Sequence, residues 1–152
     1  MASREIEEIL EKLKEKIILE TLSSRSGCCK TKPSGRPVEV RSLRELQELE
    51  RGCRVLFIMF YSPTCPYCRA FAPLFAEAAG IYGDKAAFAR VNVYELPEAA
   101  AMYGVMGVPT TIAVVDGRPV FRLVGLVDPE TFEEAILRAL ERAGCPTALQ
   151  PA

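Results

Sequence analysis

An unbroken apolar run, Val55–Tyr61 (VLFIMFY), lies near the middle of the 152-residue chain. A strand with one face in water alternates apolar and polar residues, whereas a strand covered on both faces is apolar throughout. Typical strands have about 5–6 residues, so this run is long enough for a strand and too short for an ordinary helix. It therefore predicts a central strand whose sheet has helices packed on both faces.

Strand and helix patterns alternate around this run. Before it, residues 38–40 are a short strand, and residues 42–51 are a helix opened by a Ser-x-x-Glu capping box. After it, an Asp-Gly turn joins the last two strands into a hairpin. We expect helices over 65–79, 97–103 and 129–142, and strands over 87–93, 110–115 and 119–124. The order βαβαβαββα predicts an α/β fold with a mixed sheet.

Composition divides the chain into four parts. Residues 1–22 are an amphipathic helix, and 38–145 are the globular domain. Between them, residues 23–37 are rich in Gly, Ser, Pro and basic side chains, which is typical of a linker, and they contain Cys28-Cys29. Residues 146–152 form a C-terminal tail. A single domain suits this length, at roughly 150 residues per domain.

The N-terminal helix carries an apolar stripe at helical spacing, formed by Ile6, Ile9, Leu10, Leu13 and Ile17. An isolated helix of about 20 residues gains little stability from propensity alone, so this stripe has to be buried for the helix to be stable. It can dock on its own domain or pair with the helix of a second chain, which would make a homodimer. A mobile helix is the third arrangement.

Charge and composition narrow the functional classes. The chain has 19 basic and 20 acidic residues, so no basic surface indicates nucleic-acid binding. No apolar run reaches the ~18 residues of a membrane helix, and the start of the chain is too charged for a signal peptide. We therefore expect a soluble cytoplasmic protein. With one Asn, two Gln and eleven Pro, the composition indicates a thermophilic source.

The sequence Cys65-Pro66-Tyr67-Cys68 lies where the central strand gives way to a helix. The i, i+3 spacing places both thiols on one face of the first helical turn. There the free backbone amides and the positive end of the helix dipole stabilise a thiolate. We expect Cys65 to be exposed and nucleophilic, and Cys68 to point inward as the resolving thiol.

Half of a zinc site is the alternative interpretation of this motif. Zinc takes four ligands, usually from a second cysteine pair or from histidines. The chain has no His, and the adjacent Cys28-Cys29 suit one metal ion poorly. The motif therefore predicts dithiol redox chemistry, with no metal and no other cofactor.

From about residue 38 to 143, the chain resembles the thioredoxin superfamily. The motifs occur in order: VLFIMFY, CPYCRAFAP, YGVMGVPTTIAVVDGRP, Gly125 after the last strand, and a C-terminal helix. The resemblance implies the thioredoxin fold and a protein disulfide oxidoreductase that receives electrons from a thioredoxin reductase-like donor. It also implies a cis peptide before Pro109, with the backbone of Val108 pairing with a substrate strand. The implied substrate-binding residues are Thr64, Pro66, Tyr67, Val108, Pro109 and Gly125.

The motif itself departs from that of thioredoxins. Thr64 stands in place of the usual Trp, and Pro66-Tyr67 replace the usual Gly-Pro, which gives the CPYC motif of glutaredoxins. The glutathione signature of glutaredoxins is missing, because Val124–Val127 occupy its place. We interpret the chain as thioredoxin-like with a glutaredoxin-type motif. A glutathione-linked reductase and a redox-silent binding module are the alternative functions, and the intact cysteine pair disfavours the second.

A second departure concerns the proton of Cys68. Thioredoxins bury an Asp before the motif as its acceptor, and Met59 occupies that position here. The resemblance matches Arg90 to the basic residue that faces this Asp. We expect Arg90 to extend outward or to pair with Glu95. The proton then passes to water, to a group such as Glu95, or to the leaving thiolate of Cys65.

Four further cysteines precede or follow the predicted elements: Cys28, Cys29, Cys53 and Cys145. In the fold that the resemblance implies, all four lie at the pole opposite to the active site. Adjacent cysteines seldom bond to each other. The open pairings are Cys53 with Cys145, Cys28 or Cys29 with either of these, or a bridge between chains.

Overall fold

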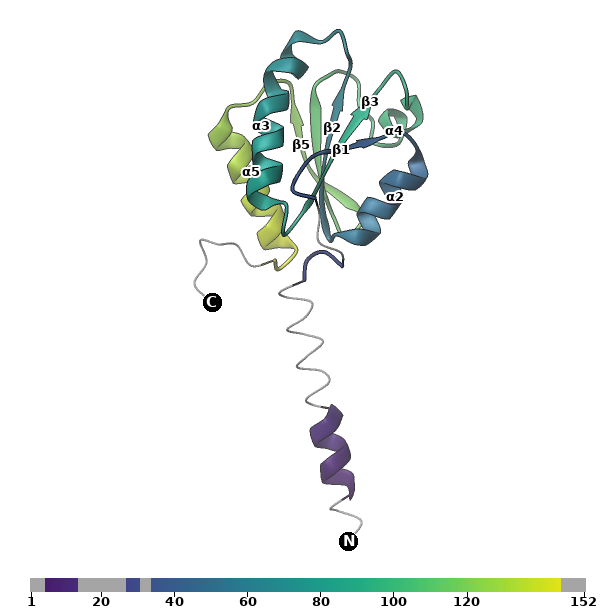
Figure 1. Ribbon diagram of the computed structural model, residues 1–152, viewed down its shortest axis with the longest axis vertical. Coiled ribbons are helices and arrows are strands. Elements are labelled where there is room, and N and C mark those ends of the chain that lie inside the picture. The colour runs from purple at the N-terminus through teal and green to yellow at the C-terminus, as the bar shows by residue number, and fades with distance from the viewer. Residues whose placement is uncertain (1–4, 14–26, 31–33, 146–152) are drawn as a thin grey trace.

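The computed structural model describes residues 5–13, 27–30 and 34–145. The domain follows the predicted order of elements (Figure 1). Its helices and strands are β1 (Val38–Val40), α2 (Leu43–Gly52), β2 (Val55–Tyr61), α3 (Pro66–Tyr82), β3 (Ala87–Asn92), α4 (Pro97–Met102), β4 (Thr110–Val115), β5 (Arg118–Val124) and α5 (Pro129–Arg142).

The five strands form one mixed sheet in the order β1-β3-β2-β4-β5. β2 lies at its centre, parallel to β3 and antiparallel to β4. β1 is parallel to β3, and β5 is antiparallel to β4. The predicted mixed sheet and the central position of the apolar run are both confirmed.

Helices cover both faces of the sheet, as predicted. α3 and α5 lie on one face, and α2 and α4 lie on the other (Figure 1). Six of the seven residues of β2 are buried because both of its faces are covered. On the α3 side, aromatic rings fill the core, with the centroids of Phe57 and Phe88 5.0 Å apart and those of Phe71 and Phe132 5.2 Å apart. Ring pairs at such distances stabilise the core beyond their buried area.

Two helices begin where the sequence predicts, and a side chain caps the start of each. The Ser42 side chain accepts the backbone N–H of Glu45 at the start of α2, and Asp128 accepts that of Thr131 at the start of α5. The hairpin turn has positive φ at Asp116 and Gly117, which a two-residue turn of the primed type requires.

α3 is longer than predicted. The sequence pattern predicts an end at residue 79, just before Gly80, but the helix continues to Tyr82. A glycine inside a helix costs only about 1 kcal/mol relative to alanine. Tyr82 packs against the core and donates a hydrogen bond to Glu133 of α5 at 3.0 Å, so tertiary contacts outweigh that cost.

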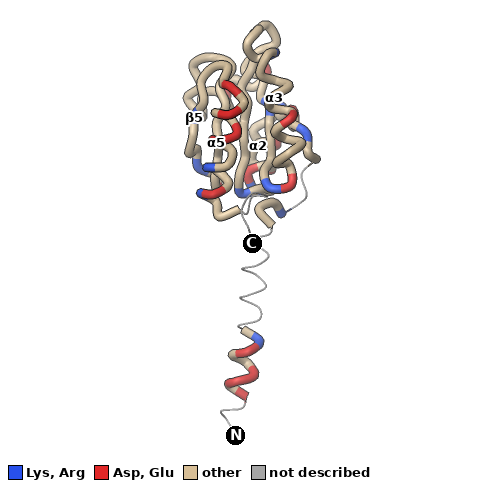
Figure 2. Tube along the Cα trace, turned by 90° about the vertical axis from the view of Figure 1, so that its left-hand side faces the viewer, with Lys and Arg blue, Asp and Glu red and all other residues tan. Residues whose placement is uncertain are grey.

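In the N-terminal segment, residues 5–13 are helical, and the rest of the predicted helix 1–22 lies outside the described residues. Four of the nine residues in the segment 5–13 are Glu, and one is Lys (Figure 2). The apolar stripe is 49–57% exposed at Ile6, Ile9, Leu10 and Leu13. No part of the described structure buries this stripe. No helix in the described ranges has both the length and the apolar character to cross a bilayer.

Two disulfides, Cys28–Cys145 and Cys29–Cys53, tie the segment 27–30 to the domain. The backbone N–H of Lys30 donates to Gly52 at 2.6 Å, and that of Arg54 donates to Cys28 at 2.7 Å. Cys28 is buried in the core cluster between the sheet and α3 and α5. The segment lies at the end of the molecule where α3 and α5 finish, opposite to the first turn of α3 (Figure 1). The four cysteines therefore meet at the predicted pole.

Candidate active site

The first turn of α3 holds the two cysteines of the predicted motif. Cys65 is the N-cap residue of this helix, and Pro66 occupies its first turn, where a missing N–H costs nothing. The Sγ of Cys65 accepts the backbone N–H of Cys68 at 3.2 Å. The positive end of the helix dipole and this N–H favour negative charge on that sulfur.

The two thiols differ in exposure. Cys65 is partly exposed, whereas Cys68 is only 3% exposed. Burial, followed by the hydrogen bond with Cys65, raises the pKa of the Cys68 thiol to about 11. Cys68 therefore stays protonated at neutral pH and has to lose a proton before it can act as a nucleophile.

The loop before β4 faces Cys65. The peptide bond between Val108 and Pro109 is cis, which confirms that prediction. The thiol of Cys65 donates to the carbonyl oxygen of Val108 at 3.7 Å. The backbone N–H of Gly125, just after β5, donates to the carbonyl oxygen of Pro109 at 2.8 Å. The fold thus brings five of the predicted site residues together from three separate segments.

Three further predicted residues surround Cys65. Thr64 and Pro66 are its chain neighbours, and both are exposed. Tyr67 is 65% exposed at the same tip. The positions of these residues leave them accessible to a molecule that approaches Cys65.

Comparison with known proteins bears on both the fold and its chemistry. The thioredoxin family model matches residues 44–138. A thioredoxin of Alicyclobacillus acidocaldarius is 34% identical over 95 residues, which cover 62% of this chain and 90% of that protein. A thioredoxin of Staphylococcus epidermidis is 36% identical over 89 residues, covering 59% and 84%. The chain belongs to the thioredoxin family.

Solved thioredoxin structures agree with this family assignment. A mutant thioredoxin from Halobacterium salinarum superposes with a TM-score of 0.68 and 30% identity, covering 80% of this chain and 99% of that one. The thioredoxin of Schistosoma mansoni gives a TM-score of 0.60 at 30% identity, covering 68% and 95%. The predicted thioredoxin fold and the predicted thiol–disulfide oxidoreductase function are both confirmed.

Arg90 lies opposite Met59 in the sheet, and its contacts differ from those that the sequence predicts. Met59 is fully buried, as expected of a core side chain. Arg90 was expected to extend outward or to pair with Glu95, but its Nε lies 3.9 Å from Glu39 Oε2, and its guanidinium lies 4.4 Å from the centre of the Tyr61 ring. The reason is the strand order, because β1 lies next to β3 and places Glu39 opposite Arg90.

The Tyr61 hydroxyl donates a hydrogen bond to Glu39 Oε1. Sequence reasoning did not find Glu39 as a candidate. The only sequence feature that distinguishes Glu39 is that it is a carboxylate between two apolar residues in the strand 38–40.

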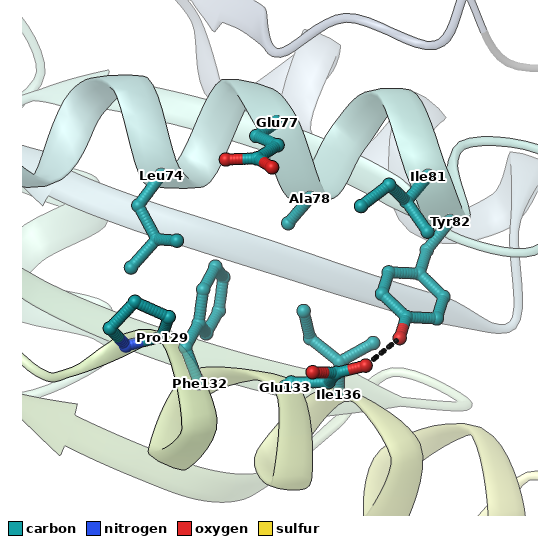
Figure 3. Close-up of a pocket in the computed structure, with 9 residues that line it drawn as sticks. All are labelled: Leu74, Glu77, Ala78, Ile81, Tyr82, Pro129, Phe132, Glu133 and Ile136. Carbon is teal, nitrogen blue, oxygen red and sulfur yellow. Dashed lines mark hydrogen bonds between the residues drawn. The ribbon is translucent and has the colours of Figure 1, made fainter.

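A groove of about 290 Å³ between α3 and α5 lies outside this site (Figure 3). Apolar side chains such as Leu74, Ile81 and Phe132 line it, and the hydrogen bond between Tyr82 and Glu133 crosses one end. The groove contains no cysteine, so we assign it no part in thiol chemistry.

In the reduced protein, we expect iodoacetamide to alkylate Cys65 at least roughly tenfold faster than Cys68 at pH 7. With a pKa of about 11, Cys68 is a thiolate in only about one molecule in 10,000 at that pH. Mass spectrometry of peptides after limiting alkylation measures the two rates. Faster labelling of Cys68 would reverse the roles of the two cysteines.

Proposed function

We propose that Cys65 and Cys68 are the nucleophile and the resolving thiol with which this chain reduces protein disulfides. The Cys65 thiolate attacks one sulfur of a substrate disulfide, which forms a mixed disulfide and releases the first substrate thiolate. The Cys68 thiolate then attacks Cys65, which forms the Cys65–Cys68 disulfide and releases the second. The substrate gains two electrons, and a thioredoxin reductase-like donor returns them to the chain. The observation that carries this proposal is the Cys65 sulfur, partly exposed at the N-terminus of α3, beside a buried Cys68.

The substrate-binding surface in this proposal surrounds Cys65. An extended substrate segment pairs with the backbone of Val108, as in other cases of strand addition. Thr64, Pro66 and Tyr67 contact the substrate from the motif side, and Gly125 and Pro109 contact it from the other. The short distances from Val108 to Cys65 and from Gly125 to Pro109 support one continuous surface.

Pro66-Tyr67 give this chain a glutaredoxin-type CPYC motif on a thioredoxin-type body. We propose that this dipeptide sets a reduction potential different from that of a Gly-Pro motif, because the residues between the cysteines change how readily the thiolate forms. The same dipeptide favours one second candidate, a reductase that takes its electrons from glutathione.

Insulin reduction with two alternative donors tests the function. We expect turnover with a thioredoxin reductase and turnover with glutathione at least about tenfold slower, because the chain lacks a glutathione signature at Val124–Val127. Precipitation of the reduced insulin B chain gives the rate. Turnover with glutathione alone would establish the second candidate. No turnover with either donor, or with dithiothreitol, would indicate a redox-silent binding module.

We also propose that the protein lies in the cytoplasm of a thermophilic cell. We propose that the chain has four parts, with boundaries at residues 22, 37 and 145. We propose further that the N-terminal helix forms a homodimer. Intracellular disulfides are common in hyperthermophiles, so the two disulfides at the far pole are compatible with the cytoplasm. The exposed stripe on residues 5–13 supports the homodimer, since a second copy would bury it.

A further inference from the structure

The resolving step needs a proton acceptor near Cys68. Its thiol is buried and protonated at neutral pH. Met59 of β2, six residues before Cys65, is fully buried, and its thioether cannot take a proton. The sulfur becomes a nucleophile only when its proton leaves for another group.

A cavity of about 160 Å³ lies beside Cys68. It is lined by Tyr61, Ser62, Pro63, Cys68, Arg69, Ala72 and Arg90. One water molecule needs only about 10–15 Å³ of such space, so the cavity has room for several. Cys68 therefore shares a space large enough for water with Tyr61 and Arg90.

The other side of Tyr61 leads to a carboxylate. The Tyr61 hydroxyl donates to Glu39 Oε1, and Arg90 stacks over the Tyr61 ring. In the sheet, Glu39 lies opposite Arg90, and Arg90 lies opposite Met59. A carboxylate thus stands two strands away from Met59, and it is hydrogen-bonded to Tyr61, one of the residues that line the Cys68 cavity.

The chemistry of Tyr61 suits a relay. Burial, and then the hydrogen bond and charge of Glu39, raise the pKa of Tyr61 to about 12. The hydroxyl therefore keeps its proton at neutral pH. A protonated hydroxyl can donate to Glu39 and accept from a water in the cavity at the same time.

We propose that Glu39 is the proton acceptor for Cys68, reached through the Tyr61 hydroxyl and water in the adjoining cavity. This inference rests on the roles proposed above for Cys65 and Cys68. The Cys68 proton passes to water, a proton passes from water to the Tyr61 oxygen, and the Tyr61 proton passes to Glu39. The Cys68 thiolate then bonds to the sulfur of Cys65. The bond from Cys65 to the substrate breaks, and its electron pair leaves with the substrate sulfur.

Glu39 can also pass the proton on to solvent. Its side chain is 30% exposed, which gives a proton on this carboxyl group a path to solvent. The other charged or titratable groups near this route are Cys65, Arg69, Arg90 and Glu95. Arg69 and Arg90 are cations and cannot accept a proton, and Arg69 donates to the carbonyl oxygen of Pro63 at 3.0 Å. Glu95 influences Tyr61 by charge alone, whereas Glu39 is hydrogen-bonded to it.

The test measures the resolving step by itself. A mixed disulfide of Cys65 with thionitrobenzoate is formed, and stopped-flow absorbance follows the release of the coloured thiolate by Cys68 from pH 6 to 10. In Glu39→Gln, we expect release to be roughly 10²-fold slower at pH 7, which is within the range of general base catalysis. The rate of the variant should rise about tenfold per pH unit, because only the thiolate fraction of Cys68 then limits it. The difference from the parent protein should shrink towards pH 10.

Three variants complete the design. Tyr61→Phe removes the relay hydroxyl alone and should slow release as Glu39→Gln does; it decides the matter if Glu39→Gln fails to fold. Glu95→Gln is the matched control and should leave release unchanged. Unchanged release in Tyr61→Phe, or in a folded Glu39→Gln, overturns the proton route. Alkylation of Cys65 in the same variants keeps the two proposals apart, because the proton route can fail while Cys65 remains the fast-reacting thiol.

Discussion

The Cys65→Ser variant is expected to lose disulfide reduction, with a rate lower by roughly 10³-fold or more. A serine hydroxyl does not ionise near neutral pH, so the helix N-terminus and the backbone N–H of Cys68 have no thiolate to stabilise. Cys68 does not substitute, because it is 3% exposed and its pKa is about 11. Insulin reduction with dithiothreitol as donor measures the loss without involving a reductase.

The matched variant is Cys68→Ser, which should behave differently. Cys65 still attacks the substrate, but no thiol resolves the product, so mixed disulfides accumulate. Non-reducing electrophoresis detects them as adducts that dithiothreitol removes. The double variant should form none. Adducts in Cys65→Ser and none in Cys68→Ser would show that Cys68 is the nucleophile and Cys65 the resolving thiol.

The second large expected effect is on thermal stability, when the disulfide Cys28–Cys145 is removed. Cys28–Cys145 closes a loop with a sequence separation of 117, and Cys29–Cys53 closes one of 24. In the chain-entropy model, such loops stabilise the fold by about 5 and 3.5 kcal/mol respectively when each acts alone. Replacement of Cys28 and Cys145 by Ala is therefore expected to lower the Tm by roughly 10–20 °C. Calorimetry measures the shift.

Activity should survive this change. The disulfides hold the segment 27–30 at the end of the domain opposite to the first turn of α3 (Figure 1), so insulin reduction at 25 °C should stay within about twofold of the parent rate. A chain that starts at Val38 lacks Cys28 and Cys29. It should likewise have a lower Tm but an almost unchanged rate of insulin reduction. Alkylation of the unfolded protein without reductant provides the control, since the disulfides protect four of the six cysteines. An unchanged Tm, or lost activity in a folded protein, would contradict this division of the chain.

Much of the fold was determined by local sequence chemistry. The run Val55–Tyr61 is apolar at every position except the tip of its last residue, so only a strand covered on both faces suits it. Ser42 and Asp128 begin helices because their side chains satisfy free N–H groups there. The cysteine motif likewise required a helix start, and Cys65 caps α3. Each of these signals acts within a few residues, so the sequence alone contains it.

Contacts between distant segments were decided by the tertiary structure alone. Cys28 and Cys29 are adjacent, yet they bond to Cys145 and to Cys53, and spacing along the chain left several pairings open. Arg90 faces Glu39 and not Glu95, because β1 joins the sheet beside β3. The order of strands in a sheet depends on how whole elements pack, which no local pattern contains. The proposed route from Cys68 through Tyr61 to Glu39 depends on that order, since it joins residues from three elements.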